Sequence, residues 1–201
     1  MSEITAQMEA LIRQRVETST ALKHEVAKQS SLVAAVAGKL IETYKAGKKV
    51  LLFGNGGSAA DAQHLAAELV GRYYLRRRAL PAIALTVNTS VITAVGNDYG
   101  FDIVFARQVE AFGDVGDTAI GISTSGESRN VIEGLKAARR KEMTTIGMTG
   151  TGGGGVRRES DLCICVPSND TPRVQEAHIL IGHLLCELVE AALCGSADVR
   201  T

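Results

Sequence analysis

The chain has no excess of charge of either sign. It contains 22 Lys and Arg residues against 22 Asp and Glu, and its isoelectric point is about 6.9. A nucleic-acid-binding protein needs a surplus of basic residues to meet the phosphate backbone, so the composition predicts no nucleic-acid partner. We interpret the one conspicuous basic run, Arg76-Arg77-Arg78, as a solvated loop, with an oligomer contact as the second interpretation.

Paired-cysteine motifs and long apolar runs are absent as well. The four cysteines form no CxxC motif, since Cys163 and Cys165 fall on one face of a predicted strand, and Cys186 and Cys194 on the last predicted helix. We interpret them as reduced core residues of a cytosolic protein. The N-terminus shows no basic segment followed by an apolar stretch, and no apolar run approaches the about 20 residues of a membrane span. We therefore expect a soluble, cytoplasmic protein with no membrane partner.

The most informative stretch of the sequence is residues 50–68, where an apolar run, a glycine turn and an alanine-rich segment follow one another. The run Val50-Leu51-Leu52-Phe53 is typical of a buried parallel strand, and Gly54-Asn55-Gly56-Gly57-Ser58 ends it. The next segment predicts a helix with Ser58 as its N-cap and Asp61 in its first turn. The free N–H groups of such a turn and helix start can bind an anion.

A dinucleotide site is a weak alternative for this turn. Its glycines fit the loose dinucleotide fingerprint, but no Asp or Glu occurs between Glu68 and Asp98, and residues 79–106 contain no Arg or Lys. On the predicted helix, His64 and Glu68 stand four residues apart and share one face. That pair is either two solvated side chains or two ligands of a metal ion beside the anion site.

A second candidate anion site follows the third predicted strand, residues 117–122. The loop Ser123-Thr124-Ser125-Gly126-Glu127-Ser128 carries four hydroxyls and precedes a predicted helix at residues 130–141. Open α/β sheets bind ligands at the carboxyl ends of their strands, and N-capping accounts for one hydroxyl rather than four. Because no GK[ST] motif occurs, a nucleoside triphosphate with magnesium is disfavoured, and a single phosphate monoester fits the loop.

The remaining segments complete an alternation of strands and helices. Residues 1–48 are predicted to be helical, and these helices either pack on the sheet or form an oligomer contact. Further strands are expected at 82–85, 144–148 and 162–166. Further helices are expected at 90–95, at 103–112 and from Pro172 to about Leu193. A turn is expected at 96–100, and a flexible glycine turn at 149–155. The pattern predicts a single α/β domain over residues 1–201, with a mostly parallel sheet of about five strands.

Four motifs in this order resemble those of the bacterial phosphoheptose isomerases of the sugar isomerase (SIS) domain family. They are GNGGSAADAQHLAAE at residues 54–68, GNDYG at 96–100, STSGES at 123–128 and TPRVQEAHILIGH at 171–183. The resemblance covers nearly the whole chain and implies a flavodoxin-like α/β/α sandwich that forms a homotetramer. It also implies the conversion of sedoheptulose 7-phosphate to D-glycero-D-manno-heptose 7-phosphate, for the heptose of lipopolysaccharide.

The same resemblance implies a set of site residues. One zinc ion per subunit would be bound by His64, Glu68, Gln175 and His183. Substrate contacts would come from Asn55, Gly56, Gly57, Ser58, Glu68, Asn97, Asp98, Ser123, Thr124, Ser125, Ser128 and Gln175. Because the reaction moves a proton from C1 to C2 through an enediol, it needs a base and an acid; Glu68 is the candidate base and His183 the candidate acid. Zinc would polarise the carbonyl and stabilise the enediolate.

The spacing of two implied ligands raises a geometric question. Gln175 and His183 are eight residues apart, which is about 12 Å of rise on an unbroken helix. Either the two side chains lean toward each other, or the helix starts after Gln175, or the two ligands come from different subunits.

A protein of another class is the alternative function. A non-catalytic SIS protein that senses a phosphosugar, or that docks on a replication-initiator partner, would keep the phosphate loops. It would have no need of His64, Glu68 and His183 together, and the presence of all three favours the enzyme.

Overall fold

The apolar runs form the strands of one sheet in the computed structural model, which describes residues 3–195. Every neighbouring pair of strands is parallel, and the order across the sheet is β2-β1-β3-β4-β5. This is the flavodoxin-like order, as predicted, and it places the topological switch point between β1 and β3. The strands are β1 (Val50–Gly54), β2 (Ala82–Ala84), β3 (Thr118–Ser123), β4 (Thr144–Thr149) and β5 (Leu162–Cys165).

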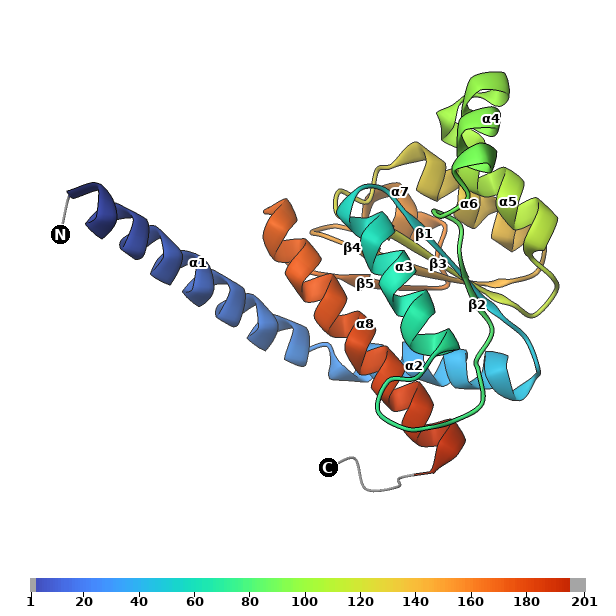
Figure 1. Ribbon diagram of the computed structural model, residues 1–201, viewed down its shortest axis with the longest axis horizontal. Coiled ribbons are helices and arrows are strands. Elements are labelled where there is room, and N and C mark those ends of the chain that lie inside the picture. Colours follow the sequence, from blue (N-terminus) through green and yellow to red (C-terminus); the bar gives the residue numbers. More distant parts are fainter. Residues whose placement is uncertain (1–2, 196–201) are drawn as a thin grey trace.

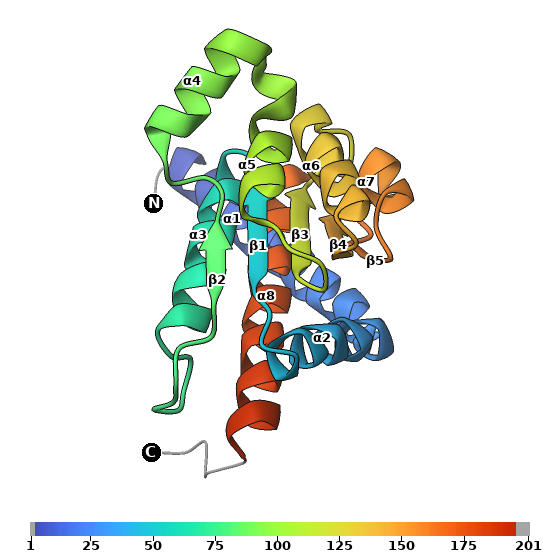
Figure 2. The same cartoon turned by 90° about the vertical axis from the view of Figure 1, so that its right-hand side faces the viewer.

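Helices cover both faces of the sheet and complete the predicted α/β/α sandwich (Figures 1 and 2). One layer contains α2 (Ser30–Lys45), α3 (Gly57–Val70) and α8 (Thr171–Cys194). The other contains α5 (Val104–Phe112), α6 (Arg129–Arg140) and the short α7 (Gly154–Arg158). The long α1 (Glu3–Ala27), α4 (Thr89–Tyr99) and the 3-10 turn η1 (Phe101–Ile103) lie at the periphery.

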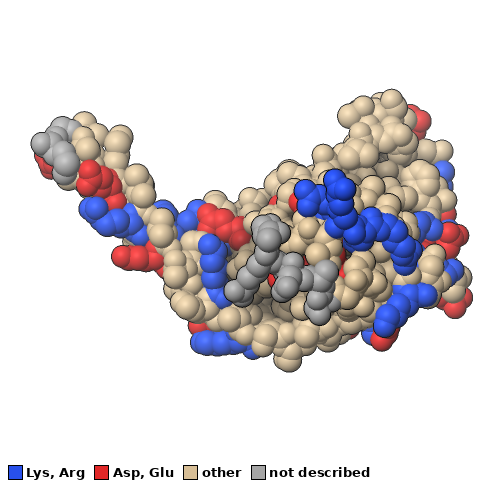
Figure 3. Space-filling model, turned by 60° about the horizontal axis from the view of Figure 1, so that its bottom comes forward, with Lys and Arg blue, Asp and Glu red and all other residues tan. Residues whose placement is uncertain are grey.

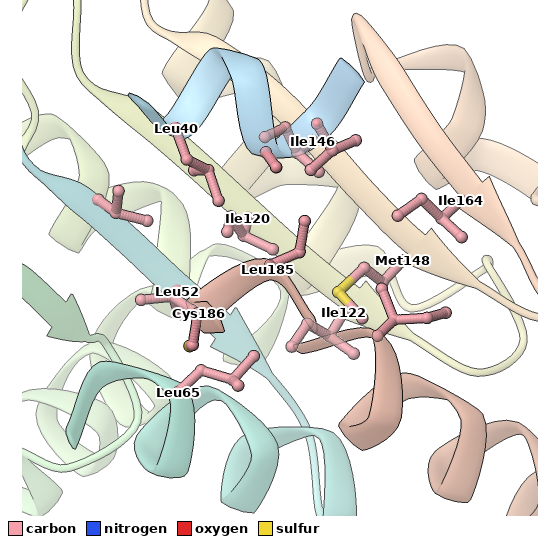
Figure 4. Close-up of a cluster of buried hydrophobic side chains, with 14 of the residues drawn as sticks. Leu40, Leu52, Leu65, Ile120, Ile122, Ile146, Met148, Ile164, Leu185 and Cys186 are labelled. Atoms are coloured by element: carbon pink, nitrogen blue, oxygen red, sulfur yellow. The ribbon is translucent and has the colours of Figure 1, made fainter. Parts of the chain in front are cut away.

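Alternating side chains of the strands build two apolar cores, one on each side of the sheet. Leu52 belongs to the larger core, where it meets Leu65 of α3 and Leu185 of α8, as Figure 4 shows. Its neighbour Phe53 belongs to the other core and stacks on Phe105 of α5 at a centroid distance of 5.3 Å. Because both faces of β1 are buried, its sequence is a continuous apolar run rather than an alternating one.

The two N-terminal helices have different environments. Helix α2 packs on the sheet through residues such as Leu40 and Tyr44, whereas α1 buries only Leu22 and Val26, near its end. The rest of α1 projects from the body (Figure 1), and the space-filling view shows side chains of both charge signs along it (Figure 3). Its exposed apolar side chains are Ile4, Met8, Leu11, Ile12 and Val16. The first proposed role, packing on the sheet, therefore applies to α2, and the oligomer contact stays a prediction for α1.

The segment expected to turn at residues 96–100 is helical in the structure. Helix α4 begins after Asn88, whose side chain accepts a hydrogen bond from Val91 N, and continues through Asn97 and Asp98 to Tyr99. The helix ends at Gly100, whose φ of 95° suits glycine. The prediction of a turn at 96–100 was wrong because Gly96 lies inside the helix, and the glycine conformation that ends the helix occurs four residues later.

The glycine run after β4 is packed rather than flexible, which corrects the second loop prediction. Gly150 N donates to Thr124 O, and Val156 N donates to Gly126 O, so the run is bonded to the hydroxyl loop after β3. A Cβ atom on Gly126 would lie 2.4 Å from Gly153 O, a distance that side chains do not tolerate. The glycines therefore allow two backbone segments to approach closely, and the last two of them begin the short helix α7, which was not predicted.

Helix α8 is long and apolar enough to cross a membrane by length and composition, but it is a core helix of this fold. It packs against α1, α2, α3 and β4, with Val174, Ile181 and Val189 fully buried. It begins at Thr171, so Pro172 stands in its first turn as predicted.

The cysteines are free thiols, but most are not core residues. Only Cys186 is buried; Cys163 and Cys165 are half-buried and Cys194 is exposed. Cys163 and Cys165 do share a strand face, with their sulfur atoms 3.7 Å apart. The description as core residues was therefore wrong for three of the four, because β5 is an edge strand and Cys194 is the last residue of α8.

Candidate active site

The loops after β1 and β3 meet at the topological switch point. These strands are paired directly, with Gly54 opposite Ile122. Asn55 Nδ2 donates to Asn130 Oδ1 at 2.8 Å, and Asn130 Nδ2 donates back to Asn55 Oδ1 at 2.8 Å. The two candidate anion sites in the sequence therefore border a single site, in the crevice where such sheets bind ligands.

The turn after β1 begins α3 earlier than the sequence predicted. Gly56 holds the N-cap position with a φ of 54°, and Ser58 lies buried inside the first turn without capping the helix. Asp61 consequently falls in the second turn, not the first. The N–H groups of the first helical residues donate to the carbonyls of Asn55 and Gly56, so this turn leaves fewer N–H groups for an anion than predicted.

The loop after β3 presents its hydroxyls as one cluster. Ser123 Oγ donates to Ser128 Oγ at 2.9 Å and lies 3.4 Å from Ser125 Oγ, which also accepts from Glu127 N. Ser128 occupies the N-cap position of α6, but its side chain makes no capping bond. Ser123 is buried, Thr124 and Ser128 are half-buried and Ser125 is exposed, so the cluster borders solvent. Clustered hydroxyls at a helix start suit a phosphate group.

Three side chains implied as metal ligands come together between α3 and α8. His64 Nε2 lies 2.9 Å from His183 Nε2 and 3.5 Å from Glu68 Oε1. The exposed fractions are 45% for the His64 side chain and 24% for that of Glu68, so a ligand can reach them. The close pair in sequence, His64 and Glu68, is therefore joined by a residue 119 positions away.

The zinc ion that the resemblance implies needs nitrogen and oxygen ligands. Two imidazole nitrogens and one carboxylate are a ligand set of catalytic zinc sites, and His64, His183 and Glu68 supply it. Residues 3–195 contain no group of three or more His, Cys, Asp and Glu side chains placed so as to hold a metal ion. The three residues fit zinc by the chemistry of their donor atoms, and to bind one ion their side chains would have to rearrange around it.

Gln175 lies on the same helix as His183, but near its start, beside the turn after β1. An added Cβ on Gly57 would lie 2.3 Å from Gln175 Nε2, so this amide packs directly against the turn after β1. Helix α8 is continuous from Thr171, which rules out a helix start after Gln175. Within this chain the Gln175 amide thus borders the turn after β1. His183, eight residues later on α8, lies next to His64 instead.

Asn97 and Asp98 are exposed on α4. Asn97 Nδ2 donates to Asp98 Oδ1 at 2.7 Å, and no hydrogen bond in the described part of the chain joins them to the two loops. Beneath α4 lies a cavity of about 150 Å³. Its lining residues are Gly54, Asn55, Gly56, Ala59, Thr86, Ile92, Phe101, Val104 and Phe105. The predicted substrate contact of Asn97 and Asp98 has no support, within residues 3–195, from a hydrogen bond to either loop and stays a prediction.

Sequence reasoning missed several residues at the site. Asn130 was seen only as the start of a helix, although its position after a hydroxyl loop was a usable signal. The Tyr73 ring lies 5.7 Å from the His183 ring, and no local pattern announces that contact. Asp61, one turn before His64, has a buried Oδ2 atom without a hydrogen-bond partner among the described residues. Burial raises the pKa of Asp61 to about 6, and the nearby His64 lowers it in part.

Comparisons with known proteins identify the family of the chain. Family models of the SIS domain match residues 16–150 and 111–193. The chain is 58% identical to the phosphoheptose isomerase of Rhodospirillum rubrum over 81% of this chain and 86% of the relative. It is 54% identical to that of Geobacter sulfurreducens over 96% and 98%. The structure of the phosphoheptose isomerase from Neisseria gonorrhoeae matches with a TM-score of 0.87 at 41% identity, over 92% of this chain and 99% of that one. The chain belongs to the SIS domain family and, within it, to the phosphoheptose isomerases.

Proposed function

We propose that this chain is an aldose–ketose isomerase that converts sedoheptulose 7-phosphate to D-glycero-D-manno-heptose 7-phosphate. The observation that carries the proposal is the meeting of His64 and Glu68 of α3 with His183 of α8, on a helix that starts beside the hydroxyl loop. Gly57 and His64 are seven residues apart on α3, which corresponds to a rise of about 10 Å. That separation suits a substrate whose phosphate and reacting carbons are at opposite ends of a seven-carbon chain.

The proposed chemistry uses one base and one acid. Glu68 removes the C1 proton of the ketose while His183 donates a proton to the C2 oxygen, which gives the enediol. Glu68 then returns its proton to C2 while the C1 hydroxyl gives its proton back to His183, so that the aldose forms and both residues regain their starting states. The phosphate is held by the hydroxyls of residues 123–128, far enough along the substrate to fix its orientation.

A zinc ion is proposed as the cofactor, one per subunit. His64, Glu68 and His183 would hold it, with Gln175 as the fourth ligand that the resemblance implies. When bound, zinc supplies a Lewis acid that polarises the substrate carbonyl and stabilises negative charge on its oxygen.

A homotetramer is proposed as the active form. Because α8 is unbroken, Gln175 and His183 serve one ion only if their side chains lean together or if subunits share the site. The exposed apolar residues of α1 and the exposed Asn97 and Asp98 of α4 are the surfaces through which subunits would contact one another. We further propose a cytoplasmic enzyme that supplies heptose for lipopolysaccharide, with no nucleic-acid or membrane partner.

Turnover of sedoheptulose 7-phosphate by the purified protein, before and after chelation, tests the activity and the metal together. We expect isomerisation that is lost on chelation and restored by zinc, with about one zinc ion per chain in elemental analysis. Light scattering should show a tetramer. A protein that binds the sugar phosphate without turnover, even with zinc supplied, would instead be the non-catalytic SIS protein.

A further inference from the structure

The middle arginine of the basic run is buried, contrary to the prediction of a solvated loop. The side chains of Arg77 and Glu190 are each 2% exposed, and Arg77 Nε donates to Glu190 Oε2 at 2.8 Å. Arg76 and Arg78 on either side are exposed, so the prediction holds for them. Removing two charges from water carries a large penalty, and a buried ion pair is therefore weak evidence for stability.

The Glu190 carboxylate is almost completely hydrogen-bonded. Besides Arg77, it accepts from the backbone N–H groups of Tyr73, Tyr74 and Leu75, at 2.6–2.9 Å. Burial acts to raise the pKa of Glu190, but these donors and Arg77 together lower it, so the carboxylate is charged. Glu190 thus fixes the chain that leaves α3.

Arg77 reaches the backbone of the proposed base. Its Nη2 donates to the carbonyl oxygen of Glu68 at 2.8 Å, and its Nη1 donates to those of Leu69 and Arg78. The last turn of a helix has carbonyls without intrahelical partners, and Arg77 satisfies two of them there. The position of Glu68 is therefore set by the guanidinium that Glu190 holds.

Glu190 also connects to the proposed acid. It stands seven residues after His183 on α8, so both lie on one face of that helix. The Tyr73 N–H donates to Glu190 Oε2, and the Tyr73 ring packs against the His183 ring at 5.7 Å. A second connection thus runs from Glu190 through Tyr73 to the imidazole.

We propose that the Arg77–Glu190 pair positions the isomerase site by holding Glu68 on α3 and His183 on α8 in register. This rests on the roles proposed above for Glu68 and His183. Neither member of the pair touches substrate, so both are positioning residues. A misplacement of about 1 Å at a reacting centre reduces turnover by about a hundredfold, which gives the pair a functional reason for burying its charges.

A variant of Glu190 and a matched variant elsewhere separate positioning from stability. Glu190→Gln loses two acceptor positions and leaves Arg77 unpaired. The control is Asp117→Asn, because Asp117 is also buried, accepts from Lys49 N and Asp114 N, and pairs with Lys49 Nζ at 2.7 Å. Asp117 precedes β3, at the end of the sheet opposite the ligand loops.

The readout is steady-state kinetics, measured well below the melting temperatures of both variants. We expect Glu190→Gln to lower kcat by about 10- to 100-fold with KM changed less than about threefold, and Asp117→Asn to keep kcat within about twofold. A wild-type kcat in folded Glu190→Gln would overturn the positioning role. A fully active Glu68→Gln would instead overturn the proposed chemistry, so the two failures are distinguishable.

Variants of Arg77 provide a second test. It includes a double variant that is expected to fold even if a single variant does not. Arg77→Met should lower kcat, whereas Arg78→Met, at the exposed neighbour, should not. The double variant Arg77→Met with Glu190→Leu replaces the pair by apolar groups, which often preserves stability. We expect this double variant to fold and to keep a low kcat; wild-type turnover by it would overturn the proposal.

Discussion

Asn55 and Asn130 exchange two hydrogen bonds of 2.8 Å each, although 75 positions separate them. The pair joins the turn after β1 to the first turn of α6, across the switch point of the sheet. Because both amide groups are used in this exchange, the Asn55 side chain orients the turn, and its predicted substrate contact would come from the atoms that the pair leaves free.

Asn130→Ala should loosen that junction. The substitution removes both hydrogen bonds and leaves a half-buried Asn55 amide, at a cost of about 1–3 kcal/mol in unfolding free energy. We expect KM for the sugar phosphate to rise more than kcat falls, because the two phosphate-binding segments lose their alignment. Denaturant titration and kinetics measure the two effects, and an unchanged KM would show that the loops are aligned without the pair.

The local parts of the fold were predictable from the sequence. Apolar runs gave the five strands, and hydroxyl and glycine clusters gave both loops at the carboxyl edge, because strand burial and turn chemistry depend on neighbouring residues. The end of α4 at Gly100 rather than Gly96 was not predictable, since both glycines are plausible stops.

Long-range pairs were the part that sequence reasoning could not reach. Nothing local distinguishes Arg77 from Arg76 and Arg78, because its burial depends on a carboxylate 113 positions away on α8. The packing of the glycine run against residues 123–128 likewise depends on the order β3-β4-β5 in space. A single sequence gives residue types and spacing, whereas these contacts follow from the tertiary arrangement.

Replacement of Ser123, Ser125 and Ser128 by Ala together should remove most phosphate binding. Each hydroxyl is expected to make a charge-assisted hydrogen bond that contributes about 1.5–3 kcal/mol. The free energy of substrate binding should therefore become less favourable by several kcal/mol. Inorganic phosphate as a competitive inhibitor gives an independent readout, because it probes the subsite without the sugar. Unchanged affinity for both ligands would place the phosphate at the turn after β1 alone.

His178 should make the unfolding free energy pH-dependent. It is fully buried, and burial lowers its pKa to about 4, while the bond between its Nε2 and Thr149 O acts in the opposite direction. The unfolded chain, with an ordinary histidine pKa of about 6.5, binds the proton more readily. The stabilising contribution is therefore complete above about pH 6.5 and is lost as pH falls toward 4, at up to about 1.4 kcal/mol per pH unit.

His178→Gln tests this, since glutamine keeps an N–H donor for Thr149 O but does not titrate. Denaturant unfolding at several pH values between 4 and 7 should show a shallower slope for the variant than for the wild type. Groups common to both proteins, Asp61 among them, cancel in the difference. Parallel slopes would mean that His178 is protonated equally in the folded and unfolded chains.

Gly126→Ala should damage the hydroxyl loop more than Gly152→Ala does. Both glycines have a positive φ, 71° and 81°, so the backbone strain of adding a Cβ is similar, about 1–2 kcal/mol. Only at Gly126 does the new atom meet backbone, with Gly153 O at 2.4 Å, whereas at Gly152 it meets nothing within 4 Å. We expect a rise in KM for Gly126→Ala alone, and equal KM values would mean that the glycine run does not shape the phosphate site.

Glu68 and His183 should both be indispensable, and their losses should not add. Removing either group removes the proton-transfer advantage, about 10²–10⁴-fold in rate, and also removes a proposed metal ligand. Glu68→Gln keeps the size of the side chain and one oxygen but cannot accept the C1 proton at neutral pH. It should therefore bind substrate while turnover collapses, whereas His183→Ala should also lose zinc, measured by elemental analysis.

The double variant should be scarcely slower than the slower single variant, because groups that act as a unit are non-additive. Exchange of the substrate C1 hydrogen in deuterated water isolates the base, since it reports proton removal without completed isomerisation. Wild-type protein should incorporate deuterium at C1, and Glu68→Gln should not. Exchange by Glu68→Gln at the wild-type rate would leave Glu68 as a ligand only. Asp98, which is exposed on α4, would then be the next candidate for the base.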